Sequence, residues 1–390
     1  MARYHLTQLE SVDVLRKTAC AWDTLWQRSE VTTPTARAEM LALWLEQFAA
    51  GSRFRALVVW EGKRIVAALP LIGQRLGGVV DAAALPTNAW SPGGDLLLDL
   101  DADADAAMDL IAAKLFTSDS ALAWLEAARL DRRSWQSLLR AADRAQLGVD
   151  YRPGFEAAVI PVPADWDTYQ RSWSKGHRKS MRRAVQRLER DGGCELELHR
   201  NITFGQAELL LQEGFAIEDR SWKGRDGTSV MRNDGMVEFF LRQGRQLAEW
   251  GQLELAFLRH AGRRIAFEYA FRAKGVYHSL KVGYDEQFAR CSPGQVLTCL
   301  LLQRMVGDPR RQAMDCMGPI NDATRKWTDQ SYTIGRLVIA PRRLLGRTLM
   351  HVYKRWWPAV RRLARRGEPL QPTTPSATTA SAEGTGRETS

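Results

Sequence analysis

Residues 263–306 constrain the fold more than any other part of this 390-residue sequence. Apolar residues alternate with other residues over 265–271 and again over 276–284, with a short Gly-containing stretch at 273–275. This alternation has the period of a β-strand, and the stretch between is typical of a hairpin turn. A nearly unbroken apolar run follows over 296–306, as in a buried helix. The pattern predicts two antiparallel strands, a loop and a buried helix.

The start of that helix has the features of an anion site. Ser292 is a favourable N-cap, Pro293 fits the first helical turn, and Gly294 would let a ligand approach the backbone. The first N–H groups of a helix have no intrahelical partner and attract anions. We therefore predict that Ser292, Gly294 and Gln295 bind a phosphate-bearing cofactor. The alternative is that they only cap the helix.

The two strands carry the candidate catalytic and acceptor residues. Glu268 alternates away from the large apolar residues, onto the face of Ala266 and Ala270. A carboxylate there suits a general base that takes a proton from an attacking amine, although an ion pair with a nearby arginine is the alternative. On the next strand, strict alternation places Tyr277 and Lys281 on one face, and His278 and Tyr284 on the other. Lining of an acceptor cleft and simple packing both fit these residues, and Tyr284 is a further catalytic candidate.

Positive charge is concentrated in two segments, although the net charge is +10. Residues 171–190 hold eight Lys and Arg residues against one acid. Lys175, Arg178, Lys179 and Arg182 there follow helical spacing and predict a face for an anionic acceptor, or else a solvated helix. Residues 341–366 hold nine Lys and Arg residues and no acid. They fall in a predicted amphipathic helix over 336–366, which would lie on an anionic membrane surface or dock on the domain.

Length and composition indicate two domains, 1–150 and 151–335, followed by the basic helix and a disordered tail over 367–390. A hairpin motif at 62–67 recurs at 262–266, which suggests one fold in tandem. Neither an N-terminal signal-peptide core nor an apolar stretch long enough for a membrane span is present. The 5 cysteines are scattered, so we expect reduced thiols in the cytoplasm and no metal site.

Several motifs resemble the CelD-type branch of the GNAT acetyltransferases, which is related to the tandem-GNAT FemABX transferases. The resemblance is specific over 155–330 and weaker over 1–150, where it rests on the hairpin and Leu69-Pro70-Leu71. The matching motifs are Trp166-x-x-Tyr169, the Lys/Arg run through Arg187-Leu188-Glu189, Gly192, Glu218-Asp219-Arg220, Gly262-Arg263-Arg264-Ile265-Ala266, Gly283-Tyr284-Asp285, Ser292-Pro293-Gly294, Asp315-x-x-Gly318 and Lys326-Trp327.

This resemblance implies an α/β fold of two GNAT-like domains, the first degenerate, with mixed, mostly antiparallel sheets flanked by helices. It also implies that residues 291–295 bind the pyrophosphate of acetyl-CoA or acyl-CoA as a co-substrate, with no permanently bound cofactor. Of the usual phosphate-loop pattern, Gln/Arg-x-x-Gly-x-Gly/Ala, only Gly294 survives. Lys326 becomes a catalytic candidate, and Asp315 a substrate-binding one, unless the two residues pair with each other. Arg220 and Trp222 either contact substrate or end a helix.

The predicted function is acyl transfer from acyl-CoA to an amine or hydroxyl of a polysaccharide or cell-envelope precursor, by a direct route without an acyl-cysteine. Cys291 is the nearest exception. One alternative is a non-catalytic accessory protein of a polysaccharide synthesis complex. Another is Fem-like transfer from aminoacyl-tRNA, which the basic segment favours. DNA is not an expected partner, and membrane contact would be peripheral.

Overall fold

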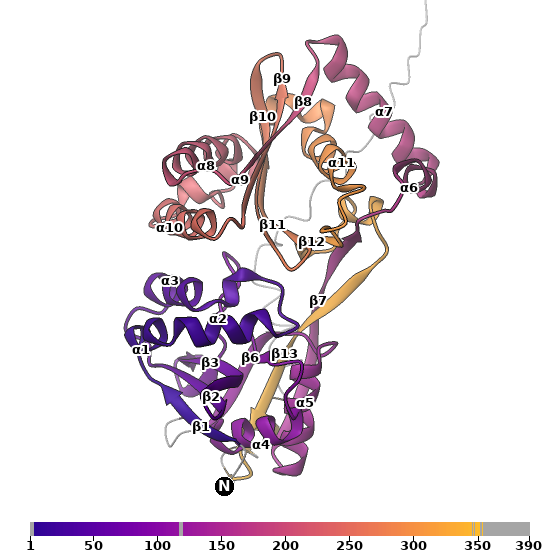
Figure 1. Ribbon diagram of the computed structural model, residues 1–390. Helices are drawn as coiled ribbons and strands as arrows, with labels where there is room; N and C mark the ends of the chain where they lie inside the picture. Colours follow the sequence, from indigo (N-terminus) through magenta and orange to yellow (C-terminus); the bar gives the residue numbers. More distant parts are fainter. Residues whose placement is uncertain (1–3, 117–119, 345, 347, 352, 354–390) are drawn as a thin grey trace, which may run out of the picture.

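The computed structural model describes residues 4–116, 120–344, 346, 348–351 and 353. The chain forms two α/β halves, one above the other in Figure 1, and the long strands β7 and β13 run between them. The first half comprises β1 (His5–Leu9), α1 (Val12–Lys17), α2 (Ala19–Gln27), η1 (Pro34–Ala36), α3 (Ala38–Phe48), β2 (Phe54–Glu61), β3 (Arg64–Leu76), β4 (Val80–Ala84), β5 (Leu97–Leu98), α4 (Ala104–Lys114), β6 (Leu122–Ala128), α5 (Arg133–Arg144) and β7 (Gly148–Pro161).

The second half contains the stretch on which the prediction rested. Its elements are α6 (Trp166–Ser172), α7 (Lys175–Arg190), β8 (Cys194–Arg200), α8 (Phe204–Asp219), α9 (Trp222–Arg225), η2 (Val230–Arg232), α10 (Met236–Glu249), β9 (Leu253–His260), β10 (Arg263–Ala273), β11 (Val276–Tyr284), η3 (Glu286–Cys291), α11 (Pro293–Met305), β12 (Ala313–Pro319), η4 (Thr324–Lys326) and β13 (Ser331–Ala340). The predicted hairpin, loop and buried helix are β10, β11, η3 and α11.

All the long strands join one sheet, in the order β1-β2-β3-β4-β6-β13-β7-β12-β11-β10-β9-β8. Each half has four antiparallel strands in sequence, β1 to β4 and β8 to β11. In each half the fourth of these strands then pairs in parallel with the next long strand, β4 with β6 and β11 with β12. The tandem α/β architecture with mostly antiparallel pairing is therefore confirmed. The two expected sheets are fused into one.

The recurring hairpin motif occupies equivalent places in the two halves. Gly62 is in the turn between β2 and β3, and Gly262 is in the turn between β9 and β10. Both glycines have positive φ, 59° and 77°, a conformation that favours residues without a Cβ. The similarity of the two sequences thus reflects the same turn between equivalent strands.

The last strand of the sheet departs from the prediction. Residues 336–340 were expected to begin the basic helix, but they belong to β13 and pair with both β6 and β7. Leu337, Val338 and Ile339 are each at most 1% exposed, because a strand between two others buries both of its faces. Most of the expected 336–366 helix, and the whole 367–390 tail, lie outside the described residues. Among the residues that are described, no helix is both long and apolar enough to cross a bilayer.

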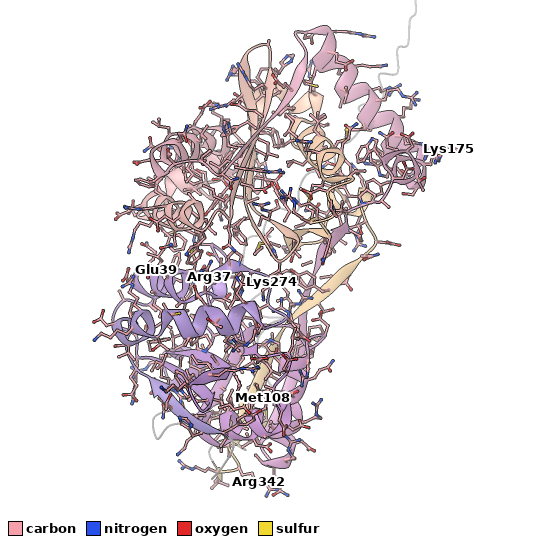
Figure 2. All side chains as sticks on the ribbon, in the orientation of Figure 1. Arg37, Glu39, Met108, Lys175, Lys274 and Arg342 are labelled. Atoms are coloured by element: carbon pink, nitrogen blue, oxygen red, sulfur yellow. The ribbon has the colours of Figure 1, made fainter. Side chains whose placement is uncertain are left out.

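The two halves also meet where the β10–β11 turn inserts into the first half. Lys274 has a φ of 48° and lies at this junction, as Figure 2 shows. Its ammonium donates hydrogen bonds to the carbonyls of Trp26, Ser29 (2.8 Å) and Val31 (2.9 Å). It also lies 4.6 Å from the centre of the Trp26 ring. One side chain therefore satisfies three carbonyls of the other half.

Lys274→Met should lower the free energy of unfolding by about 3 kcal/mol, because buried carbonyls lose their donor. Lys63→Met is the control, since Lys63 is exposed in the β2–β3 turn of the first half, and it should change stability by less than about 0.5 kcal/mol. Urea unfolding of both variants measures the difference. Equal stability of the two variants would show that this contact does not hold the halves together.

Candidate active site

A β-bulge decides which residues of β11 face the same side of the sheet. Tyr269 pairs with Lys281 but Ala270 pairs with Ser279, so Leu280 is an extra residue between them. The bulge reverses the alternation, and Lys281 lies on the opposite face from Tyr277. The prediction that these two residues share a face was therefore wrong. Tyr277 faces α11, as do Val282 and Tyr284, which pair with Glu268 and Ala266.

β11 and β12 separate shortly after they begin to pair. Their parallel register covers only three pairs and ends at His278 and Asp315. Beyond that point the backbone edge of β11 that would face β12 has no strand partner among the described residues. Val282 on this segment is 48% exposed, although it belongs to an interior strand. A ligand could therefore reach the α11 face of β11 directly beside Glu268, which pairs with Val282.

Glu268 itself is a buried carboxyl group. It is 3% exposed, and its Oε1 accepts no hydrogen bond. No described arginine or lysine pairs with it, so the alternative role in an ion pair is not observed. Burial raises the pKa of Glu268 to about 7, and the nearby hydroxyls of Ser279 and Tyr277 only partly oppose this effect. A carboxyl with this pKa can exchange a proton near neutral pH.

The start of α11 forms the second part of the site. Ser292 adopts a left-handed conformation before Pro293, and η3 leads the chain from β11 to this point. A Cβ built on Gly294 would meet only Tyr284 Cδ1, at 3.8 Å, so the approach to the backbone is open. Gln295 accepts a hydrogen bond from Trp327 Nε1 at 3.1 Å, which fixes its side chain while its backbone remains at the helix start. Tyr284 is half-buried at the end of β11, and burial raises its pKa.

The fold brings the basic helix α7 to this same point. A hollow of about 220 Å³ lies between α7 and the start of α11. Its lining consists of Gly176, Lys179, Ser180, Arg183, Ala184, Arg187, Arg290 and Ser292. Arg187 donates a hydrogen bond to the Arg290 carbonyl at 2.6 Å and so ties α7 to η3. Lys179 and Arg183 form no ion pair with any described residue, so their charge is available to an anion.

The equivalent helix of the first half has the opposite charge at its start. α4 follows β4 in the chain as α11 follows β11, but it is capped by Asp103 and carries Asp105 in its first turn. Carboxylates at a helix N-terminus occupy the place of an anionic ligand and repel a phosphate. The candidate anion site at the start of α11 therefore has no counterpart at the start of α4.

The other residues predicted from the basic segment have mixed outcomes. Lys175 and Arg182 are exposed, and Lys175 lies on the outer side of α7 in Figure 2. Arg178 instead donates hydrogen bonds to the carbonyls of Arg171 (2.7 Å) and Trp173 (2.6 Å). It therefore joins α7 to α6, and its predicted contact with a substrate stays a prediction.

Asp315 and Lys326 do not pair with each other. Asp315 is 5% exposed and accepts hydrogen bonds from the Tyr332 hydroxyl and the Met317 N–H, with His278 at 3.7 Å. This buried carboxylate connects β12 to Tyr332 of β13 and lies beside His278 of β11, and its predicted contact with a substrate stays a prediction. Lys326 is exposed in η4. Its catalytic role stays a prediction.

Arg220 and Trp222 are at the end of α8 and the start of α9. Arg220 pairs with the buried Asp285 at 3.0 Å, and Trp222 is half-buried. Tyr277 is fully buried, and its hydroxyl accepts or donates no hydrogen bond within the described residues. Its proximity to Glu268 fits a supporting role better than the predicted contact with an acceptor.

Two cysteines near the site lie where burial disfavours the thiolate form. Burial raises the pKa of both Cys299 and Cys316 to about 12. Cys291 is half-exposed at the end of η3. Burial thus argues against Cys299 and Cys316 as nucleophiles, and the direct route stays a prediction with respect to Cys291.

Sequence reasoning missed Arg183, Arg187 and Arg290 as residues of the hollow. It also missed Lys223, which donates hydrogen bonds to the Val282 carbonyl (2.6 Å) and to Glu218 (2.9 Å). The density of basic residues in 171–190 was a signal for the first two. Nothing in the sequence indicated that Lys223 reaches the open edge of β11, because more than fifty residues separate the two.

The raised pKa of Glu268 makes a testable contribution to stability. The native state binds the proton more tightly than the unfolded state, where the pKa is near 4.5, so stability falls as pH rises from about 4.5 to about 7. Glu268→Gln lacks this loss and should gain on the order of 3 kcal/mol relative to the wild type across that range. Urea unfolding at about pH 5 and about pH 8 measures it. Parallel pH profiles would contradict a buried, titrating Glu268.

The segment that contains this candidate site matches a known family model. Residues 175–325, from α7 to η4, match the model of a family described as an acetyltransferase (GNAT) domain. No curated protein matches the sequence.

Two solved structures share the fold across both halves. FemX is similar with a TM-score of 0.59 at 11% identity, over 88% of this chain and 100% of that chain. The C-terminal domain of a putative lysylphosphatidylglycerol synthetase from Agrobacterium fabrum is similar with a TM-score of 0.51 at 12% identity, over 87% of this chain and 97% of that chain. At such identities the similarity shows the fold alone. Residues 175–325 therefore match a GNAT-type acetyltransferase domain, within a fold that both halves share with FemX.

Proposed function

We propose that this protein transfers an acyl group from acyl-CoA to an amine or hydroxyl of a polysaccharide or cell-envelope precursor on the cytoplasmic side. The observation that carries the proposal is the hollow between α7 and the start of α11. The hollow combines a helix N-terminus with Lys179 and Arg183, which form no ion pair within the described residues. The start of α11 also lies near Tyr284 of β11, the strand on which the exposed Val282 pairs with Glu268.

The donor would bind through two kinds of group. The Gly294 N–H and the cations of Lys179 and Arg183 would hold the pyrophosphate, whereas the Gln295 N–H already donates to the Ser292 carbonyl at 3.0 Å. The pantetheine amides could pair with the open backbone edge of β11 beyond His278, as an added strand would. The thioester would then lie near Val282.

The chemistry follows from the position of Glu268. A typical primary amine is protonated near pH 7 and cannot attack a thioester until it loses a proton. Glu268, directly or through a water, would accept that proton as the amine nitrogen bonds to the thioester carbon. Collapse of the tetrahedral intermediate breaks the C–S bond, and the CoA thiolate leaves. The Tyr284 phenol at the end of β11 is the candidate to protonate it.

Two alternatives differ in what they require of the site. A non-catalytic accessory protein would not need an exposed strand surface beside an unpaired buried carboxyl, which Val282 and Glu268 provide. Transfer from aminoacyl-tRNA is favoured by α7, whose exposed Lys175, Lys179 and Arg182 make no ion pair within the described parts of the chain. A long polyanion would contact more of this helix than the pyrophosphate of CoA.

Millimolar acetyl-CoA should raise the melting temperature of the wild type, since a ligand that binds only the native state stabilises it. Gly294→Glu should abolish this shift, because its carboxylate fills the approach and repels the pyrophosphate. Gly294→Ala is the matched control, as its methyl group meets only Tyr284 at an ordinary contact distance, 3.8 Å. A normal shift in folded Gly294→Glu would place the donor elsewhere.

Glu268→Gln should lower turnover by about 10²–10⁴-fold with donor binding kept, because the amine loses its proton acceptor. The loss should be partly relieved at high pH, where more of the amine is already neutral. Release of CoA thiol measures turnover, and Cys291→Ala should change it little. A silent Glu268→Gln together with an inactive Cys291→Ala would replace direct transfer with an acyl-enzyme.

A further inference from the structure

The α8 face of β11 carries a second group of charges, opposite the face of Glu268. Lys281 is there because of the bulge, and Lys223 reaches the same strand from α9. The only carboxylate paired with either lysine among the described residues is that of Glu218, 2% exposed, which accepts from Lys223 Nζ at 2.9 Å. Its other oxygen accepts from the Val230 N–H at 3.1 Å. Among these groups, Glu218 therefore pairs with Lys223, and Lys281 is left without a carboxylate partner within the described residues.

The Lys281 ammonium group lies beside aromatic rings and has no hydrogen-bond acceptor among the described residues. Its Nζ lies 4.6 Å from the centre of the Trp90 ring and 5.1 Å from that of Phe240. No described residue forms an ion pair or hydrogen bond with this ammonium. Burial lowers its pKa to about 8, and the charge of Lys223 acts in the same direction. Aromatic rings stabilise a cation but leave its N–H donors unpaired.

The first half supplies one wall of this place. Trp90 belongs to a loop in which Asn88 Oδ1 accepts from the N–H groups of Trp90 (2.9 Å) and Ser91 (3.0 Å). Ser91 in turn accepts from Trp44 Nε1 at 3.0 Å and from Gln243 of the second half at 3.2 Å. These hydrogen bonds attach the loop to α10 and hold the backbone of Trp90 in place beside Lys281. The start of α4 in the first half carries carboxylates that would repel an anion. The Trp90 loop of the same half instead lies beside Lys281 of the second half.

The geometry points to Lys281 and Lys223, with Trp90, as the binding site for a carboxylate or phosphate group of the acceptor. This inference rests on the proposed function, because only a transfer reaction has an acceptor. Lys223 links the two faces, since it donates to the Val282 carbonyl at the open edge of β11. An anionic group held there would direct the rest of the acceptor toward the edge where Val282 and Glu268 pair. One surplus positive charge in a half-buried setting favours an anionic over a neutral acceptor.

Lysine acetylation measured by mass spectrometry tests the site without any enzymatic turnover. The protein is pulsed with acetic anhydride while saturated with desulfo-CoA, which would fill the α11 site but has no thiol for the anhydride to acetylate. Inorganic phosphate in one series and acetate in another should protect Lys281 and Lys223 saturably, by about tenfold at about ten times the dissociation constant. The exposed Lys63 should not be protected. The anion that protects at lower concentration identifies the phosphate or carboxylate preference.

Variants decide whether the lysines act together. Lys281→Met keeps a long side chain between the rings and should raise the phosphate or acetate concentration that protects Lys223 by about tenfold, whereas Lys281→Arg should largely restore protection. Trp90→Ala should weaken protection at both lysines. Equal acetylation with and without either anion, or protection of Lys223 that Lys281→Met leaves unchanged, would overturn the proposal.

The kinetic counterpart uses two amines that differ only by a phosphate, glucosamine and glucosamine 6-phosphate. Lys281→Met should remove any preference for the phosphorylated amine in kcat/KM without changing KM for acetyl-CoA. Loss of the CoA-induced rise in melting temperature would contradict the proposed donor, while the protection experiment repeated without desulfo-CoA would still report on the lysine site. The two failures are therefore distinguishable.

Discussion

The antiparallel pairing of β7 with β13 is the constraint on which the rest of the structure depends. The two strands pair from Ala158 with Ser331 to Gly148 with Ala340, and each also pairs with a strand of a different half. At Gly335 a Cβ would lie 2.4 Å from the Tyr151 hydroxyl, so a larger residue at this seam would have to displace the Tyr151 side chain. Because backbone hydrogen bonds continue across the seam, the halves are parts of one sheet and not two bodies on a linker.

Because the two halves share one sheet, the first half contacts the candidate site of the second half, although its own helix α4 begins with carboxylates. The β10–β11 turn inserts into it through Lys274, and the Trp90 loop returns the contact beside Lys281. Both contacts are at the ends of β11, the strand that carries the candidate site. The two halves have therefore diverged in charge at equivalent helices, with carboxylates at α4 and unpaired cations near α11. One half would bind the donor, and the other would shape the surroundings of the acceptor.

Local sequence patterns predicted much of the fold. The alternation over 265–284, the Ser292-Pro293-Gly294 helix start and the repeated Gly62 and Gly262 turns each depend on residues close in the chain, so the tandem α/β arrangement could be inferred. Element boundaries were harder to infer: residues 12–27 form two helices, α1 and α2, that meet at Thr18, and β5 spans only Leu97–Leu98. Such boundaries depend on packing between distant segments, which periodicity does not record.

The sequence by itself determined which chemistry was available: a carboxylate among small residues at Glu268, an apolar helix with an anion-binding start, and a basic segment before it. Only the tertiary structure decided how these parts combine. The bulge at Leu280 moved Lys281 to the opposite face from Tyr277, because one extra residue reverses every side chain beyond it. α7 lies against the start of α11, although more than a hundred residues separate them in the chain. Arg178 links α7 to α6. Proximity of this kind arises from sheet register and helix packing, which are non-local properties of the chain.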